Sequence, residues 1–194
     1  MTLGDVIANF GQYIVNLWPF RAISDWEQGA YLRAGQVKRL LTSTNGIRGS
    51  GIHFFIPFLD EILVMDASVE VAEGAIQTCI TSDQYSVAFQ LAIRYRIVDA
   101  SKVYQTIYEV KETVASQARA SAGELVATLP AVDKKDKGYE FSAALAEEVY
   151  GDLHERFEEW GIELQAVALS SCVFCDTYRI ITEGGSSTLN FGGM

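Results

Sequence analysis

The sequence is short of basic residues, and this shortage excludes a class of partners. Fifteen Lys and Arg stand against 25 Asp and Glu among 194 residues, so the net charge is −10 and the pI is near 4.6. Nucleic acid is therefore not expected as a main partner, because domains that bind it carry a basic patch. The same balance argues against simple electrostatic docking on anionic lipid, and any membrane attachment is expected to be mainly hydrophobic.

Cysteines are also few: Cys79, Cys172 and Cys175 are the whole set. An odd, low count predicts a reducing compartment and no disulfide framework, so we expect the domain to lie in the cytoplasm. Cys172 and Cys175 have the spacing of a redox motif, but they follow a predicted strand and do not open a helix, where a thiolate is stabilised. A thiol-dependent enzyme using this pair is kept only as a third alternative.

Histidine is scarce as well, with His53 and His154 the only two. We predict that His53 is structural and that His154, on an acidic helix, is solvated or caps the helix. Neither stands in a recognisable nucleophile–base arrangement, and one Cys pair without a second ligand pair is a weak metal signal. The sequence therefore predicts no catalytic residue, no cofactor, no metal ligand and no enzymatic activity.

Residues 1–22 lack the features of a signal peptide and of a membrane-spanning helix. No basic region precedes the apolar stretch, no small-residue cleavage site follows it, and Asp5, Asn9, Gln12 and Asn16 interrupt it. Apolar residues nevertheless recur there at helical spacing, which predicts an amphipathic helix lying in a membrane interface. The predicted membrane-contact residues are Leu3, Val6, Ile7, Phe10, Ile14, Leu17, Trp18 and Phe20. The alternative is a helix packed on its own domain or on a neighbouring subunit, since its polar face lacks Lys and Arg.

The clearest pattern that is present runs from Tyr85 to Ile97, where apolar residues occupy every second position. Strict alternation predicts a long strand with one buried face. A shorter alternation over residues 76–80 precedes the polar turn at residues 81–84, so the two strands are predicted to form an antiparallel hairpin. Asp99 follows as the N-cap of a helix.

After Asp99 the apolar period changes to about 3.6 residues, which is the period of a helix. One helix is predicted from Ala100 to Leu125, and a second, acidic one from about Glu140 to Trp160, ended by Gly161. Residues 163–172 then read as a strand with a single alternation of faces. Its two predicted faces are Leu164, Ala166, Ala168 and Ser170, and Gln165, Val167, Leu169 and Ser171.

The segment before the long strand holds a short predicted strand, residues 28–33, and a glycine-rich loop, residues 42–51, interpreted as a surface turn. No Lys-Ser/Thr and helix follow this loop, as a phosphate-binding loop would require. The apolar run from Phe54 to Phe58 is interpreted as a buried strand with Pro57 at a turn. The alternative is a hydrophobic loop that dips into lipid beside the N-terminal helix.

Four of these segments, in this order and spacing, resemble the band 7 family, also called the stomatin/prohibitin/flotillin (SPFH) domain. They are Gly51–Asp60, Thr81-Ser-Asp83, the strand that ends in Tyr95-Arg-Ile-Val-Asp99, and Trp160-Gly-Ile162. The resemblance covers residues 23–176. Ser50 stands where a proline usually precedes the glycine, and Gln84 stands for a frequent glycine, so the match is weaker at these two positions.

The resemblance implies an α+β fold with a twisted antiparallel sheet, then two long helices and a returning strand. We divide the chain into a membrane-associating segment at 1–22, a β-rich subdomain at 23–99, a helical subdomain with the closing strand at 100–176, and a flexible tail at 177–194. Family members commonly continue into a heptad coiled coil, which this sequence lacks, so assembly through one is not assumed.

For function, the resemblance implies a non-enzymatic scaffold, stomatin-like or prohibitin-like, held on a membrane by its N-terminal segment. Such proteins form large oligomers, and the implied partners are membrane lipid, further copies of the chain, and a membrane protease or other membrane protein. The alternative is a soluble adaptor that binds one protein through its N-terminal helix.

Overall fold

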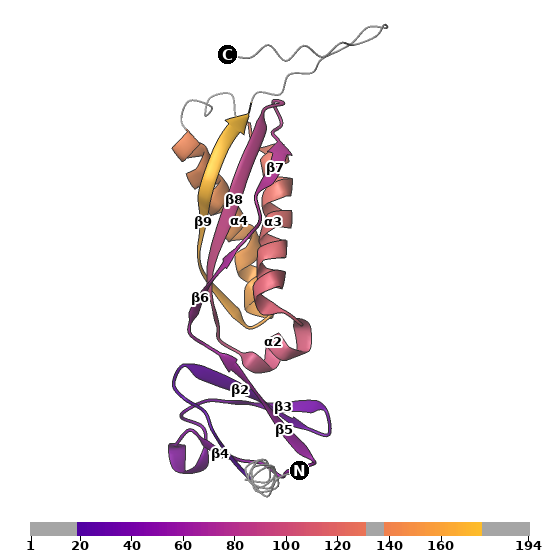
Figure 1. The fold of residues 1–194 in the computed structure, drawn as a ribbon, viewed down its shortest axis with the longest axis vertical. Coiled ribbons are helices and arrows are strands. Elements are labelled where there is room, and N and C mark those ends of the chain that lie inside the picture. The colour runs from indigo at the N-terminus through magenta and orange to yellow at the C-terminus, as the bar shows by residue number, and fades with distance from the viewer. Residues whose placement is uncertain (1–18, 131–137, 176–194) are drawn as a thin grey trace, which may run out of the picture.

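The computed structural model describes residues 19–130 and 138–175, which form an elongated molecule (Figure 1). One end, which we call the β module, consists of β1 (Phe20–Ala22), β2 (Glu27–Arg33), β3 (Gln36–Leu41), the short helical turn η1 (Ile47–Gly49), β4 (Ile52–Phe54) and β5 (Asp60–Asp66). The rest, the helical body, consists of β6 (Val69–Glu73), β7 (Gln77–Ile80), β8 (Ser86–Ile97), α2 (Ala100–Thr106), α3 (Val110–Thr128), α4 (Gly138–Glu159) and β9 (Ile162–Cys175). The predicted N-terminal helix up to residue 18, and the tail from residue 177, lie outside the described residues.

Strand β8 is the centre of the helical body. It pairs antiparallel with β9 along its length, and with β7 and β6 in turn on the other edge, which confirms the predicted hairpin. The predicted alternation is also confirmed, because every second side chain of β8 is buried: Val87, Phe89, Leu91, Ile93, Tyr95 and Ile97. Since β8 lies before residue 99 and β9 after it, one sheet joins the two predicted subdomains; their boundary stays a prediction.

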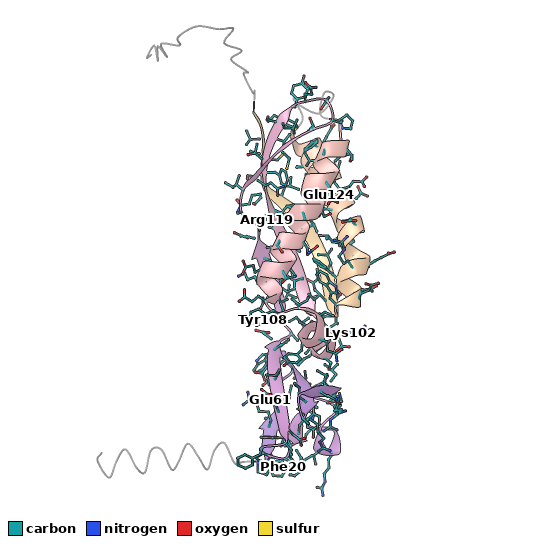
Figure 2. The ribbon with its side chains drawn as sticks, turned by 90° about the vertical axis from the view of Figure 1, so that its right-hand side faces the viewer. Phe20, Glu61, Lys102, Tyr108, Arg119 and Glu124 are labelled. Atoms are coloured by element: carbon teal, nitrogen blue, oxygen red, sulfur yellow. The ribbon has the colours of Figure 1, made fainter. Side chains whose placement is uncertain are left out.

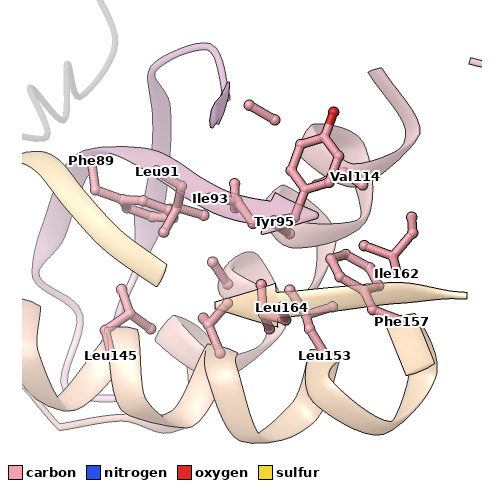
Figure 3. Close-up of a cluster of buried hydrophobic side chains, with 14 of the residues drawn as sticks. Phe89, Leu91, Ile93, Tyr95, Val114, Leu145, Leu153, Phe157, Ile162 and Leu164 are labelled. Carbon is pink, nitrogen blue, oxygen red and sulfur yellow. The ribbon is translucent and has the colours of Figure 1, made fainter. Parts of the chain in front are cut away.

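The two long helices cover the buried face of this sheet (Figure 1). Helix α4 buries an apolar residue on each turn, at spacing i, i+4: Phe141, Leu145, Val149, Leu153 and Phe157. Figure 3 shows Leu145, Leu153 and Phe157 pointing toward the side chains of β8 and β9. Burying each large apolar side chain contributes roughly 1.5–3 kcal/mol, so this cluster is the main core. The fold is α+β, as predicted.

The predicted continuous helix from Ala100 to Leu125 is wrong at its middle. The chain leaves helical geometry at Ile107 (φ −132°, ψ 133°) and at Glu109 (φ −122°, ψ 101°), which separates α2 from α3. Helix α2 packs on β2 and β3, whereas α3 packs on β6, β7 and β8. The chain has to change direction between these two surfaces, and Ile107 stays buried through the bend. The predicted N-cap is confirmed, since the Asp99 side chain accepts the N–H groups of Ser101 and Lys102.

The predicted single alternation in the closing strand is also wrong. Ala166 pairs with Arg94 but Leu164 pairs with Tyr95, so Gln165 is an extra residue, and a second irregularity follows at Ser170. Each β-bulge inserts one residue, so beyond it the side chains that face the core switch between even-numbered and odd-numbered positions. The side chains packed on the core are therefore Ile162, Leu164, Val167, Leu169, Cys172 and Phe174.

Candidate functional site: the apolar end of the β module

Large apolar side chains are exposed together at the free end of the β module. They come from β1, η1, β4 and the β4–β5 loop, and Figure 2 shows Phe20 at this extremity of the molecule. We call the set the apolar end; its members are Phe20, Ile47, Ile52, Phe54, Ile56, Phe58 and Leu59. Soluble domains rarely collect so many exposed apolar residues in one place without an interaction partner.

The short pair β1–β4 assembles half of the apolar end. Phe20 lies opposite Phe54, with ring centroids 5.6 Å apart in an edge-to-face arrangement. Phe20, Ile47 and Ile52 line an open groove of about 650 Å³. Gly51 holds this pair against the module, because its carbonyl accepts Ile23 N–H at 2.8 Å and a Cβ there would clash with the Ile23 carbonyl.

The loop from Ile56 to Asp60 presents the other half, and Asp60 holds it in place. The Asp60 carboxylate accepts Arg33 Nε at 2.8 Å, Arg33 Nη2 at 3.2 Å and the Ile56 N–H at 2.9 Å. The Asp60 N–H donates to the Ile56 carbonyl at 2.9 Å, which closes the loop. The Asp60 side chain is fully buried, whereas Arg33 is half exposed.

Arg33 keeps the Asp60 carboxyl group ionised. Its two hydrogen bonds hold the pKa of Asp60 well below the usual range of a carboxyl group, although burial acts in the opposite direction. Burial, together with the hydrogen bond and charge of Asp60, raises the pKa of the Tyr31 hydroxyl. Asp60 is therefore ionised and Tyr31 neutral near neutral pH, and the loop stays closed.

Phe58 is the most exposed of the seven. Its side chain is 93% exposed and its φ is +74°, a left-handed backbone conformation that bulky residues rarely adopt. Both features are unfavourable for a phenylalanine in water, and strain of this kind persists only where surrounding contacts enforce it. Here the Arg33–Asp60–Ile56 network enforces it, and the result is an aromatic ring held away from the protein.

Of the predicted membrane-contact residues, only Phe20 lies in the described ranges, and it is exposed at 40%. The other seven, Leu3, Val6, Ile7, Phe10, Ile14, Leu17 and Trp18, lie outside the described residues. The prediction that Phe54–Phe58 is a buried strand is wrong, because β4 ends at Phe54 and the loop beyond it is at the surface. Ile47, Ile52 and Leu59 were not predicted as site residues, since a single apolar residue gives no sign of which neighbours it will join.

The histidines and the described cysteines have other roles. His53 is buried, and its Nε2 donates to the Thr42 carbonyl at 2.8 Å, so its predicted structural role is confirmed. His154 is not simply solvated, since it is half-buried and stacks on Tyr150 with ring centroids 5.3 Å apart. Burial raises the pKa of the Cys172 thiol, the opposite of the shift that activates a thiolate. Among the described helices, none is long and apolar enough to cross a bilayer.

Comparisons with known proteins agree with the fold just described. A family model for the SPFH domain / Band 7 family matches residues 21–183. An uncharacterized protein of Archaeoglobus fulgidus is 24% identical over 83% of this chain, and a stomatin homolog of Pyrococcus horikoshii is 23% identical over 77%. The modulator of FtsH protease HflC of Escherichia coli K12 is 27% identical over 42% of this chain and 25% of its own length.

The chain is shorter than these relatives. Its match covers 60% of the Archaeoglobus protein and 52% of the Pyrococcus protein. What the whole relatives do is therefore carried to this chain only as a proposal. The resemblance predicted from the sequence over residues 23–176 is confirmed by the family match.

Proposed function

The chain belongs to the SPFH domain / Band 7 family, and on that premise we propose that it is a non-enzymatic scaffold attached to a membrane. Its apolar end and residues 1–22 enter the interfacial region of the bilayer, and the described domain stands on the cytoplasmic side. Several copies assemble, and the assembly organises the membrane or regulates a membrane protein such as a protease.

The apolar end carries the membrane part of the proposal. Phe20 begins β1, so the predicted membrane-contact segment enters the fold at the apolar end itself. Phe58 and Leu59 gain burial in lipid without any change in their conformation, because the loop is already closed by Asp60. An exposed aromatic ring is well suited to the lipid–water boundary. Each side chain contributes only a few kcal/mol at most, so tight attachment requires several copies on one surface.

Vesicle flotation tests this attachment directly. We expect the full chain to float with phosphatidylcholine vesicles, and the Phe58→Ser, Leu59→Ser double variant to float less by roughly tenfold or more, since each lost side chain removes about 1.5–3 kcal/mol of burial. Tyr108→Ser is the matched control, because Tyr108 is 97% exposed but lies away from Phe20 (Figure 2). Equal flotation of the double variant and the wild type would show that the apolar end does not bind lipid.

The outer face of the long sheet supports the assembly part. The helices cover one face of β6–β9, whereas on the other face Val69, Val71, Ile80 and Val173 are exposed. Sheets with one uncovered, partly apolar face are well suited to pack against a neighbouring copy. Light scattering coupled to size exclusion, on detergent-extracted protein with and without residues 1–22, should give a discrete oligomer. A monomer in both forms favours a soluble adaptor for a single partner instead.

The regulatory part of the proposal rests on the names of relatives. One relative is named a modulator of the FtsH protease, and this chain matches a quarter of its length. We therefore expect a membrane protease or another membrane protein to co-purify with the tagged chain from detergent-extracted membranes. Recovery of the same partner by the Phe58→Ser, Leu59→Ser variant, which is expected to leave the membrane, would indicate adaptor binding in solution.

A further inference from the structure

In the β module, basic residues gather near one end of β2 and acidic residues near the other. The net charge of −10 for the whole chain does not reveal this arrangement. At one end of β2, Glu27 lies opposite Asp66 of β5 in the strand register. At the other end, beside the apolar end, Arg33 lies opposite Asp60. From residue 19 to residue 58 the chain holds five basic and only two acidic residues. The two acids, Asp25 and Glu27, lie at the end of β2 remote from Arg33.

Three of the basic residues meet in one groove. Arg33, Lys38 and Arg39 line it together with Tyr31 and Phe54, around a volume of about 480 Å³. Among the described residues, no carboxylate lines this groove, since Asp60 is buried beneath Arg33. A bulge opposite Tyr31 and Leu32 inserts Lys38 as an extra residue in β3, and both Lys38 and Arg39 reach the groove as a result.

The cations keep donors available. Arg33 uses Nε and Nη2 for Asp60 and Tyr31, which leaves Nη1 without a partner within the described ranges. The Arg39 guanidinium lies 4.8 Å from the centre of the Tyr31 ring and makes no ion pair with any described residue. Within the part of the chain that the structure describes, Lys38 Nζ donates only to Gln36 Oε1, on the protein surface. Guanidinium and ammonium groups in this arrangement are suited to a phosphate group.

Phe54 belongs both to this groove and to the apolar end, where it packs on Phe20 at 5.6 Å. A group bound in the groove would therefore lie one side chain away from the surface that we propose enters lipid. In a bilayer the phosphate of a phospholipid has this relation to the acyl chains. Its occupant would be held at headgroup level while the apolar end lies deeper.

We propose that the groove formed by Tyr31, Arg33, Lys38, Arg39 and Phe54 binds the phosphate of an anionic phospholipid headgroup in the bilayer. This inference rests on the proposed membrane attachment and gives it a lipid preference. It also revises the expectation from composition, because a net charge of −10 repels anionic lipid only if the charge faces the membrane. In the proposed orientation the groove with Arg33, Lys38 and Arg39 faces the membrane. Salt in solution screens the repulsion between the lipid and the more distant acidic residues.

The test is flotation of the full chain on neutral phosphatidylcholine vesicles and on vesicles that also contain phosphatidylglycerol. We expect stronger binding to the anionic vesicles. Lys38→Gln with Arg39→Gln should reduce that binding by roughly tenfold or more, since each basic residue near an anionic surface contributes about 1 kcal/mol. Binding to neutral vesicles should be unchanged. Arg33 is left intact because Asp60 depends on it.

Two controls separate this groove from general charge effects and from folding defects. Lys102→Gln with Lys111→Gln removes the same charge from exposed positions of α2 and α3, away from the apolar end (Figure 2), and should bind like the wild type. The Lys38/Arg39 variant should keep the wild-type thermal unfolding curve. Soluble glycerol 3-phosphate in excess should not displace the wild type, because the proposed occupant is a lipid held in the bilayer.

The outcomes discriminate between the two proposals. Binding to neutral vesicles that does not increase with phosphatidylglycerol, or an equal loss in both charge variants, overturns the headgroup site and leaves membrane attachment standing. Displacement by glycerol 3-phosphate assigns the groove to a free phosphate ligand and also overturns it. Failure to bind either vesicle overturns membrane attachment itself, and the headgroup site with it.

Discussion

The backbone of Gly161 lies directly against that of Asp99. The Gly161 carbonyl accepts the N–H groups of Val98 and Asp99 at 2.9 Å and 3.0 Å, which joins the end of α4 to the start of α2. Gly161 has φ +82°, and a Cβ there would lie 2.7 Å from the Asp99 carbonyl oxygen. Gly161 thus lies in the turn between α4 and β9 and anchors the segment that caps α2.

Gly161→Ala should therefore destabilise the protein. The left-handed φ alone costs a residue with a Cβ about 1–3 kcal/mol, and the contact with Asp99 adds to that. Gly151→Ala in α4 is the matched control, because no atom of the described residues lies within 4 Å of the added Cβ. It should be neutral or stabilising by about 0.5–1 kcal/mol, the advantage of alanine inside a helix. Urea unfolding of both variants compares them; equal effects would contradict the close contact.

Phe157→Ala should give a large loss of stability. Phe157 is fully buried between α4 and the sheet (Figure 3), and truncation of a buried aromatic residue costs about 3–5 kcal/mol. Glu158→Ala changes the next residue of the same helix, on the exposed face, and should alter stability by no more than about 0.5 kcal/mol. Thermal and urea unfolding measure both. A small effect of Phe157→Ala would mean that α4 does not pack on the sheet in solution.

Tyr95→Phe should lower stability by about 1 kcal/mol, the usual net value of one hydrogen bond. The buried Tyr95 hydroxyl donates to Glu70 Oε2 at 2.8 Å, and burial, then this hydrogen bond, raises the pKa of Tyr95. Because the pKa of Tyr95 is higher in the folded than in the unfolded protein, the protonated hydroxyl stabilises the fold. This contribution is complete below about pH 10, the ordinary tyrosine pKa, and is lost as the pH rises further. The stability difference between the wild type and the variant should therefore shrink above about pH 10.

Tyr104→Phe provides the control for the loss of a tyrosine hydroxyl, since Tyr104 is 42% exposed. Its stability at neutral pH should stay close to that of the wild type. Unfolding free energies from urea titrations at a series of pH values give both comparisons. A constant difference between Tyr95→Phe and the wild type across the alkaline range would contradict the raised pKa of Tyr95.

Asp60→Asn should weaken the protein at neutral pH and change its acid sensitivity. The folded pKa of Asp60 is lowered, so its carboxylate stabilises the fold above the ordinary aspartate value of about 4. That contribution is lost as the pH falls below about 4 toward the folded pKa. The variant lacks this contribution at every pH, and its stability should therefore depend less on pH in the acid range.

The same variant links stability to the apolar end. Asparagine has one acceptor oxygen where the carboxylate has two, so Arg33 loses its ion pair and competes with the Ile56 N–H for the remaining oxygen. The loop that presents Phe58 should therefore open. Protection of the Ile56 and Leu59 amides from hydrogen exchange should fall, whereas Glu61→Gln on the exposed neighbouring position should leave it unchanged. Unchanged protection in Asp60→Asn would show that the loop does not depend on Asp60.

Local periodicity is sufficient where one element meets one surface along its whole length. The alternation from Tyr85 to Ile97 predicted β8, because each second side chain points to the same face of a strand. The i, i+4 series from Phe141 to Phe157 predicted α4 for the corresponding reason in a helix. The caps at Asp99 and Gly161 were also predicted, since a side-chain oxygen or a missing Cβ acts within a few residues.

The sequence by itself thus determined the long strand, the acidic helix, the helix caps at Asp99 and Gly161, the α+β class and the family. Tertiary structure decided the break between α2 and α3 at Ile107, because the two helices pack on different strands. It also decided the bulges of β9, whose register depends on β8. The apolar end and the basic groove were decided in the same way. Phe20 meets Phe54 only through the pairing of β1 with β4, and Phe54 meets Arg39 only where two separate sheets come together. Exposure and charge clustering depend on neighbours distant in sequence, and no local pattern encodes those neighbours.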